Sequence, residues 1–133
     1  MNLIQFLRGL FGGRDIPDPK DRIKESQISV SKSKVVINQE GVMLSRIANT
    51  ESMNPVIDAG HNALFIKPVK EDLQVGDIIS FKKAGVGNIM HRIIKISEDK
   101  DGWYCITKGD NSSVSDGKVR FKDIKKVLVG IVY

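Results

Sequence analysis

The feature that most constrains the fold is a series of short apolar runs, rich in β-branched residues, that recur along most of the 133-residue chain. Turn-forming residues such as Gly, Pro and Asp separate the runs. β-Branched residues favour extended strands, and many short strands at near-regular spacing are typical of a mainly β domain. The runs lie at residues 28–31, 34–38, 42–47, 63–68, 76–81, 89–96, 103–107 and 127–133. The sequence therefore predicts a compact, mainly β fold.

The first 25 residues differ in character from the rest. One face of a short helix that ends at Gly12-Gly13 would be formed by Leu3, Phe6, Leu7 and Leu10. Residues 14–24 contain two prolines and alternating charges, which is typical of an extended linker. We therefore expect residues 1–25 to be a helical appendage with a linker, and residues 26–133 to be the β domain.

The composition narrows the range of functions. An apolar fraction of 41% and a charged fraction of 28% are typical of a globular protein, and the net charge of +5 is dispersed, so no nucleic-acid partner is expected. The single cysteine, Cys105, excludes an intramolecular disulfide and is interpreted as a small core residue. Two histidines and one cysteine without close spacing predict neither a metal site nor another cofactor.

The sequence also bears on membrane contact. No stretch approaches the ~18–20 apolar residues that cross a bilayer, and residues 1–12 lack the basic start and cleavage pattern of a signal peptide. Docking on the domain, contact with a partner protein and peripheral contact with a membrane all stay open for this segment. The expected location is the cytoplasm or a viral or other assembly particle, with a membrane surface as the alternative.

The most distinctive local sequence is Thr-Glu-Ser-Met-Asn-Pro at residues 50–55, which places Ser52 in a proline-restrained segment. His91 follows 39 residues later in the sequence His-Arg-Ile, and Asp110 and Asp116 come after it. A serine hydroxyl is a weak nucleophile unless a base takes its proton and a carboxylate orients that base. Imidazole, with an unperturbed pKa near ~6.5, suits the role of base. These residues together predict an activated serine.

Five motifs occur in order along the chain, and together they carry a resemblance. They are Ser-Met-x-Pro at 52–55, Val-Gly-Asp-Ile-Ile-Ser-Phe at 75–81, His-Arg-Ile at 91–93, Thr-Lys-Gly-Asp-Asn at 107–111 with Asp116, and Val-Gly-Ile-Val at 129–132. Over about residues 45–133 the chain resembles the signal peptidase I family, within the larger group that also holds the LexA-like self-cleaving repressors. The resemblance implies a compact, β-barrel-type catalytic fold. The histidine resembles the archaeal and endoplasmic-reticulum branch, whereas the other branches use lysine.

The resemblance implies a serine endopeptidase that works through an acyl-enzyme. Ser52 would be the nucleophile, His91 the general base and Asp116 the carboxylate that orients the imidazole. Asp110 resembles the second acidic residue of that branch and would support the site. The Ser52 N–H and the Thr50 hydroxyl would stabilise the oxyanion. The expected partner is a protein or peptide substrate with small residues before the cut, extended beside a strand edge.

Each of these residues also has a plainer interpretation. Ser52 would suit a turn before proline, His91 a partly buried strand position, and both aspartates the capping of turns between residues 109 and 117. Which of Asp110 and Asp116 orients His91 therefore stays open.

Glu51 departs from the resemblance, because the histidine branch usually has glycine before the nucleophile. A carboxylate at this position would oppose a developing oxyanion unless it points away. Together with the missing bilayer-crossing segment, this favours a second hypothesis, a catalytically inactive structural or interaction module, for example in a viral particle. A self-cleaving DNA-linked regulator is disfavoured, because no helix-turn-helix is recognisable.

Overall fold

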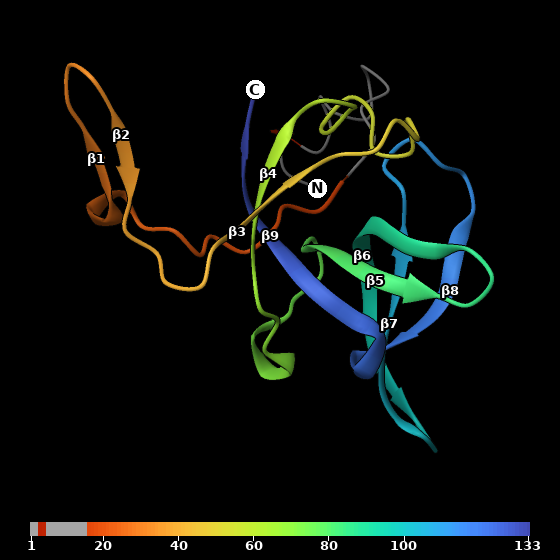
Figure 1. The fold of residues 1–133 in the computed structure, drawn as a ribbon. Coiled ribbons are helices and arrows are strands. Elements are labelled where there is room, and N and C mark those ends of the chain that lie inside the picture. The colour runs from red at the N-terminus through yellow and green to blue at the C-terminus, as the bar shows by residue number, and fades with distance from the viewer. Residues whose placement is uncertain (1–2, 5–15) are drawn as a thin grey trace.

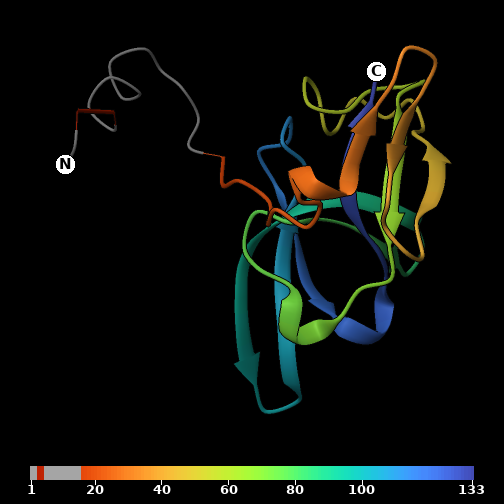
Figure 2. The same ribbon diagram turned by 90° about the vertical axis from the view of Figure 1, so that its left-hand side faces the viewer.

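A seven-stranded antiparallel sheet forms the body of the protein, with strand order β3-β4-β9-β5-β6-β7-β8. The computed structural model describes residues 3–4 and 16–133, and the sheet curves strongly around its interior (Figure 1, Figure 2). The strands are β1 (Ile28–Val30), β2 (Val35–Ile37), β3 (Met43–Arg46), β4 (Asn62–Ile66), β5 (Ile78–Lys83), β6 (Gly87–Asp99), β7 (Gly102–Lys108), β8 (Ser115–Arg120) and β9 (Ile124–Val132). Three short 3-10 helices are η1 (Glu25–Gln27), η2 (Lys70–Asp72) and η3 (Phe121–Asp123).

The core is divided between two apolar clusters, because successive side chains on a strand point to opposite faces. In β5, Ile79 and Phe81 belong to one cluster while Ile78 belongs to the other. The first cluster contains Leu73, Ile79, Phe81, Ile93, Cys105, Val119, Ile124 and Val127. The second contains Met53, Ile57, Ala63, Phe65, Ile78 and Leu128. Met53 follows Ser52, so burial of its side chain fixes the candidate nucleophile to the core.

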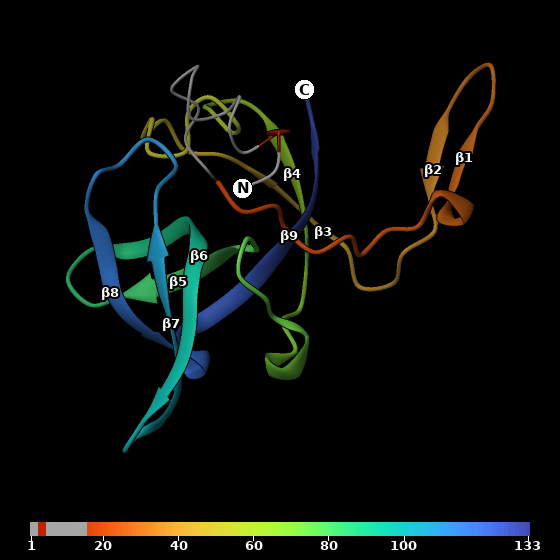
Figure 3. The same cartoon turned by 180° about the vertical axis from the view of Figure 1, so that it is seen from behind.

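Strands β1 and β2 form a separate two-stranded hairpin, which projects away from the seven-stranded sheet (Figure 1, Figure 3). Its pairs Ile28–Ile37 and Val30–Val35 place four aliphatic residues on one face, and Val30 is 76% exposed. An isolated two-stranded hairpin is marginally stable in water. The hairpin therefore differs from strands β4 to β9, each of which contributes buried residues to one or both of the apolar clusters.

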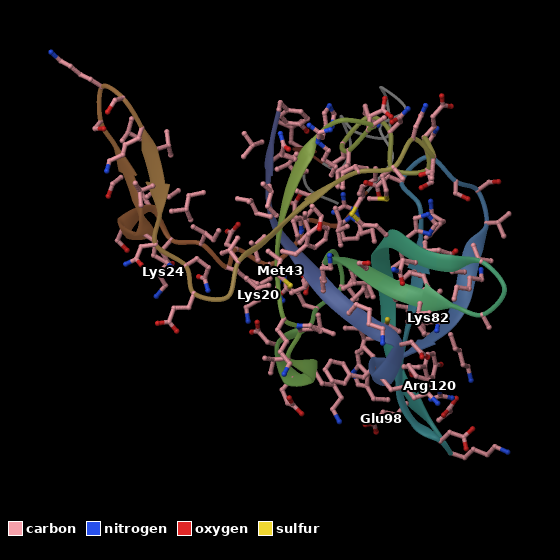
Figure 4. The ribbon with its side chains drawn as sticks, viewed as in Figure 1. Lys20, Lys24, Met43, Lys82, Glu98 and Arg120 are labelled. Carbon is pink, nitrogen blue, oxygen red and sulfur yellow. The ribbon has the colours of Figure 1, made fainter. Side chains whose placement is uncertain are left out.

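The segment before the hairpin is tied to the sheet by ion pairs. Arg22 donates two hydrogen bonds, of 2.7 and 2.8 Å, to the fully buried carboxylate of Asp77, and these bonds raise the pKa of Arg22. Lys20 pairs with Asp72 and lies where the segment passes between the hairpin and the sheet (Figure 4). At Gly76, with φ +103°, a Cβ atom would lie 1.8 Å from the Asp18 carbonyl oxygen, so only glycine allows this crossing.

The predicted mainly β fold is confirmed, and each predicted apolar run contains or overlaps a strand. Strand β8 was missed, because residues 109–117 were interpreted as turns. The sequence of β8, Ser-Asp-Gly-Lys-Val-Arg, buries only Val119 and pairs with β7 alone, so it lacks the apolar pattern of a central strand.

Two predictions about the N-terminus have different outcomes. Apart from Leu3 and Ile4, the predicted helix over residues 1–12 lies outside the described residues. Residues 16–24 have no regular secondary structure, and Pro17 and Arg22 within them make hydrogen bonds to the sheet domain. The domain boundary at residue 25 stays a prediction.

Within the described residues, no helix has both the length and the apolar character that a bilayer crossing requires.

Cys105 provides a test of the core. Its side chain is fully buried, and burial raises the pKa of the thiol to about 12, so the reactive thiolate is scarce near neutral pH. We expect iodoacetamide at pH 8 to alkylate the native protein at least about a hundredfold more slowly than the protein unfolded in urea. Mass spectrometry of quenched samples gives both rates, with glutathione as the control for urea. Equal native and unfolded rates would contradict the burial of this side chain.

Candidate active site

His91 and Asp116 meet across the sheet although 25 residues separate them in sequence. His91 lies on β6 and Asp116 on β8, and β7 lies between these strands. The His91 Nδ1 atom is 2.6 Å from Asp116 Oδ2, and the two side chains are only 12% and 10% exposed. The hydroxyl of Thr107, on β7, donates a 2.8 Å hydrogen bond to the same carboxylate oxygen. The carboxylate is therefore held from two directions while it contacts the imidazole.

A third group reaches the other oxygen of this carboxylate. Lys83, at the end of β5, places Nζ 3.6 Å from Asp116 Oδ1. This ammonium is partly exposed, so the solvent screens the ion pair. The orientation of Asp116 thus depends on β5 and β7 as well as on His91.

Ser52 lies in the loop between β3 and β4. Its carbonyl oxygen accepts a 2.9 Å hydrogen bond from the Asn111 N–H, and Asn111 Nδ2 donates to the Glu51 carbonyl at 3.2 Å. Its side-chain Oγ is 3.2 Å from the Thr50 hydroxyl. Within the part of the chain that the structure describes, no hydrogen bond joins Ser52 Oγ to His91, and no backbone carbonyl accepts the Ser52 N–H.

Gly109 is the point where the Ser52 loop and the His91 imidazole come together. A Cβ atom on this residue would lie 2.6 Å from the Ser52 carbonyl oxygen and 3.0 Å from His91 Nε2. The approach to the backbone oxygen is too short for a side-chain carbon, and the approach to Nε2 would require the imidazole to shift, so glycine suits this packing. The Nε2 atom, opposite the Nδ1 that contacts Asp116, therefore faces the Ser52 loop.

Asp110 has a different partner from Asp116. Arg92 Nε and Nη2 donate to its two carboxylate oxygens at 2.9 and 2.7 Å, and both side chains are almost completely buried. Arg92 Nη1 also donates to the carbonyl oxygens of Pro17 and Gly76. A bidentate pair of this kind fixes geometry as well as charge. Asp110 therefore anchors the loop that begins at Gly109.

Ser52 and His91 line the same cavity of about 530 Å³. One side is formed by residues 45–48, which include the end of edge strand β3, and another by Val86 and residues 88–90 around the start of β6. The larger apolar side chains of the wall include Ile47, Met53, Ile57, Phe65, Ile89 and Met90. Charged side chains on the lining are Arg46, Glu51 and Lys126. The cavity is large enough to hold several residues of an extended peptide.

The structure thus brings together Thr50, Ser52, His91 and Asp116, and it places Asp110 beside Arg92. Sequence reasoning missed three supporting residues, Lys83, Thr107 and Asn111. Thr107 and Asn111 lie within the recognised 107–111 motif, so that motif was the available signal. Lys83 had no such signal, because its proximity to Asp116 arises only from strand pairing. Lys108 donates to two backbone carbonyls, of Gly109 and Ser112.

Comparison with known proteins identifies relatives of one kind. The chain is 42% identical over 67 residues to the signal peptidase complex catalytic subunit sec11 of Dictyostelium discoideum, covering 49% of this chain and 37% of the relative. It is 32% identical over 87 residues to SEC11 of Scheffersomyces stipitis, covering 61% and 52%. It is 33% identical over 67 residues to signal peptidase I W of Bacillus subtilis, covering 49% and 35%. These matches support membership of the signal peptidase I family.

The similarity covers only part of each relative. The chain spans between about a third and a half of the signal peptidases it matches. No protein-family model matches the chain, and no solved structure matches it. The matches support the predicted signal peptidase I family over the aligned part of the chain, whereas the LexA-like character of the fold stays a prediction.

The backbone conformation of Glu51 is unusual for a residue other than glycine, and a substitution can test its effect on stability. Its φ of +58° lies in the left-handed region, which costs an L-residue about 1–2 kcal/mol and costs glycine almost nothing. Because glycine also increases the entropy of the unfolded chain, we expect Glu51→Gly to raise the free energy of unfolding by only about 1 kcal/mol. Urea denaturation measures this change.

The matched control is Glu51→Ala, which removes the charge but keeps the Cβ atom. We expect little or no gain from this variant. A gain from alanine equal to that from glycine would show that the carboxylate, and not the backbone conformation, destabilises the loop.

Proposed function

We propose that the protein is a serine endopeptidase of the signal peptidase I type, in which Ser52 is the nucleophile, His91 the general base and Asp116 the orienting carboxylate. The observation that carries the proposal is the 2.6 Å contact between His91 Nδ1 and Asp116 in the wall of the cavity that Ser52 also lines. A carboxylate on Nδ1 selects the imidazole tautomer whose Nε2 can accept a proton.

The proposed reaction follows the usual two stages of acyl transfer. Ser52 Oγ attacks the carbonyl carbon of the scissile peptide bond while His91 Nε2 takes the hydroxyl proton. The same proton passes to the leaving amine, and an acyl-enzyme remains. A water molecule, deprotonated by His91, then attacks the acyl group and releases the acid product and Ser52. Asp116 stabilises the imidazolium that forms in each stage.

The step from the observed geometry to this reaction requires one rearrangement. Ser52 Oγ is next to Thr50 Oγ1, so its hydroxyl has to turn toward His91 when substrate binds. Catalytic hydrogen bonds are often long or poorly aligned in unliganded sites and tighten in the complex. The convergence of the Ser52 loop and Nε2 on Gly109 supports a short movement.

Two groups are suited to stabilising the oxyanion. Among the described residues, the Ser52 N–H has no backbone acceptor, so it is available to a substrate oxygen. The Thr50 hydroxyl, 3.2 Å from Ser52 Oγ, is the second candidate donor. Glu51 lies between them in sequence and lines the cavity, so its carboxylate has to point away from the oxyanion.

The cavity suits an extended peptide because strand edges border it. Strand β3 pairs only with β4, and residues 87–91 of β6 pair with β5 but not with β7 in the described structure. Both segments therefore offer unpaired backbone groups toward an added strand. A substrate that pairs with either edge would gain backbone hydrogen bonds without a specific sequence.

The central prediction concerns labelling by a serine-directed fluorophosphonate reagent. We expect the full chain to be labelled on Ser52 at pH 8, because His91 activates this hydroxyl, and Ser52→Ala to abolish labelling. Intact-mass and peptide-mapping mass spectrometry identify the site.

Ser45 provides the matched control, since it also lines the cavity but is not assigned to catalysis. Ser45→Ala is expected to keep the label on Ser52. Equal labelling of the native chain and Ser52→Ala, or none at all, would contradict the peptidase and favour an inactive module.

The two aspartates are expected to differ in what they support. Asp116→Asn would leave the fold intact but favour the wrong imidazole tautomer, and we expect labelling to slow by about 10³–10⁴-fold. Asp110→Asn would leave Arg92 buried without its anion, and we expect it to lower the free energy of unfolding by about 3 kcal/mol. Labelling kinetics and urea denaturation separate the two effects. A folded Asp110→Asn protein that labels more slowly than Asp116→Asn would reverse these roles.

A further inference from the structure

Lys126 places an ammonium group on the wall of the cavity that Ser52 and His91 line. It lies on β9, opposite Ser80 of β5, and its side chain is half-buried. Its Nζ donates a 3.0 Å hydrogen bond to the Ser45 hydroxyl and lies 5.3 Å from the centre of the Phe65 ring. The charged group is therefore held inside the cavity by a neutral hydroxyl and an aromatic face.

No carboxylate balances this charge within the part of the chain that the structure describes. Neither Lys126 nor Arg46, the second cation on the cavity lining, makes an ion pair there. The charged groups around the site are otherwise Glu51 on the lining and the ion pairs that hold Asp116 and Asp110. A partly desolvated ammonium without an anion gains more from a carboxylate than from a hydroxyl.

We propose that Lys126 selects peptides that carry an aspartate or glutamate within a few residues of the bond to be cleaved. This inference rests on the proposed function, because it assumes that the cavity binds an extended peptide. Alternate side chains of such a peptide point into the cavity, so one of them can replace the Ser45 hydroxyl at Nζ. The Phe65 ring excludes water from one side of the ammonium and so strengthens its attraction for a carboxylate.

Arg46 has a different role from Lys126 in the binding of acidic peptides. It is exposed at the end of β3, on the rim of the cavity, where solvent weakens its interactions. A rim cation accelerates the approach of an acidic peptide more than it fixes the position of one side chain. The positional preference is therefore assigned to Lys126.

The experiment measures peptide capture and not cleavage. Immobilised full-length Ser52→Ala protein is incubated with acetylated, amidated octapeptide libraries in which glutamate or glutamine is fixed at each position in turn and the other positions are randomised. Mass spectrometry quantifies the captured peptides. At one or two positions we expect glutamate to be captured about fivefold better than glutamine, which is the upper end of what an exposed ion pair contributes.

Three further substitutions in the Ser52→Ala background identify the residue responsible. Lys126→Met keeps the aliphatic stem over Phe65 and is expected to abolish the preference, whereas Lys126→Arg retains the charge and the preference. Lys125→Met is the matched control, because Lys125 is the exposed neighbour on the same strand. The Lys125→Met variant should prefer glutamate as strongly as the Ser52→Ala protein does. Thermal unfolding checks that each variant is folded.

The outcomes separate this inference from the peptidase proposal. Equal capture of glutamate and glutamine at every position, a preference that survives Lys126→Met, or no capture of any peptide would overturn the role of Lys126. Selective capture of acidic peptides by a protein whose Ser52 is never labelled would support Lys126 and contradict the peptidase. If Ser52 is labelled but acidic peptides are not preferred, the result would support the peptidase and contradict the role of Lys126.

Discussion

The buried ion pair between Arg92 and Asp110 is the interaction on which the candidate site depends. It connects the middle of β6 to the loop after β7, and the third guanidinium nitrogen extends the connection to the Pro17 and Gly76 carbonyls. Four segments that are distant in sequence therefore meet at one side chain. Replacing such a pair by apolar residues is often neutral for stability, but removing one partner is costly. Its main contribution here is to fix the geometry of the segments that it joins.

The positions next to this pair explain why it matters for chemistry. His91 immediately precedes Arg92, and Gly109 immediately precedes Asp110, so the pair sets how the imidazole and the glycine meet the Ser52 loop. Asp116 is then free to contact Nδ1 from β8. Two carboxylates of similar sequence surroundings thus have different partners, because one faces a buried guanidinium and the other faces an imidazole at the cavity.

The loop that carries Ser52 combines firm anchoring with local strain. Burial of Met53 and the hydrogen bond from Asn111 hold the loop against the core. Glu51 nevertheless has a left-handed backbone conformation, which glycine adopts without strain. Conformational strain of this kind often occurs at functional sites, where the surrounding contacts enforce it. The backbone of this loop therefore retains a geometry that suits glycine although the chain carries glutamate.

The sequence by itself determined the mainly β fold, because the periodicity of β-branched residues is a local property, and it determined the candidate residues through motifs that are contiguous. The tertiary structure decided what depends on strand pairing. It placed Asp116 and not Asp110 against His91, formed β8 from polar residues that gain their partners only at a sheet edge, and brought Lys83, Thr107 and Lys126 to the site from three other strands. These contacts join residues far apart in the chain, so no local pattern encodes them.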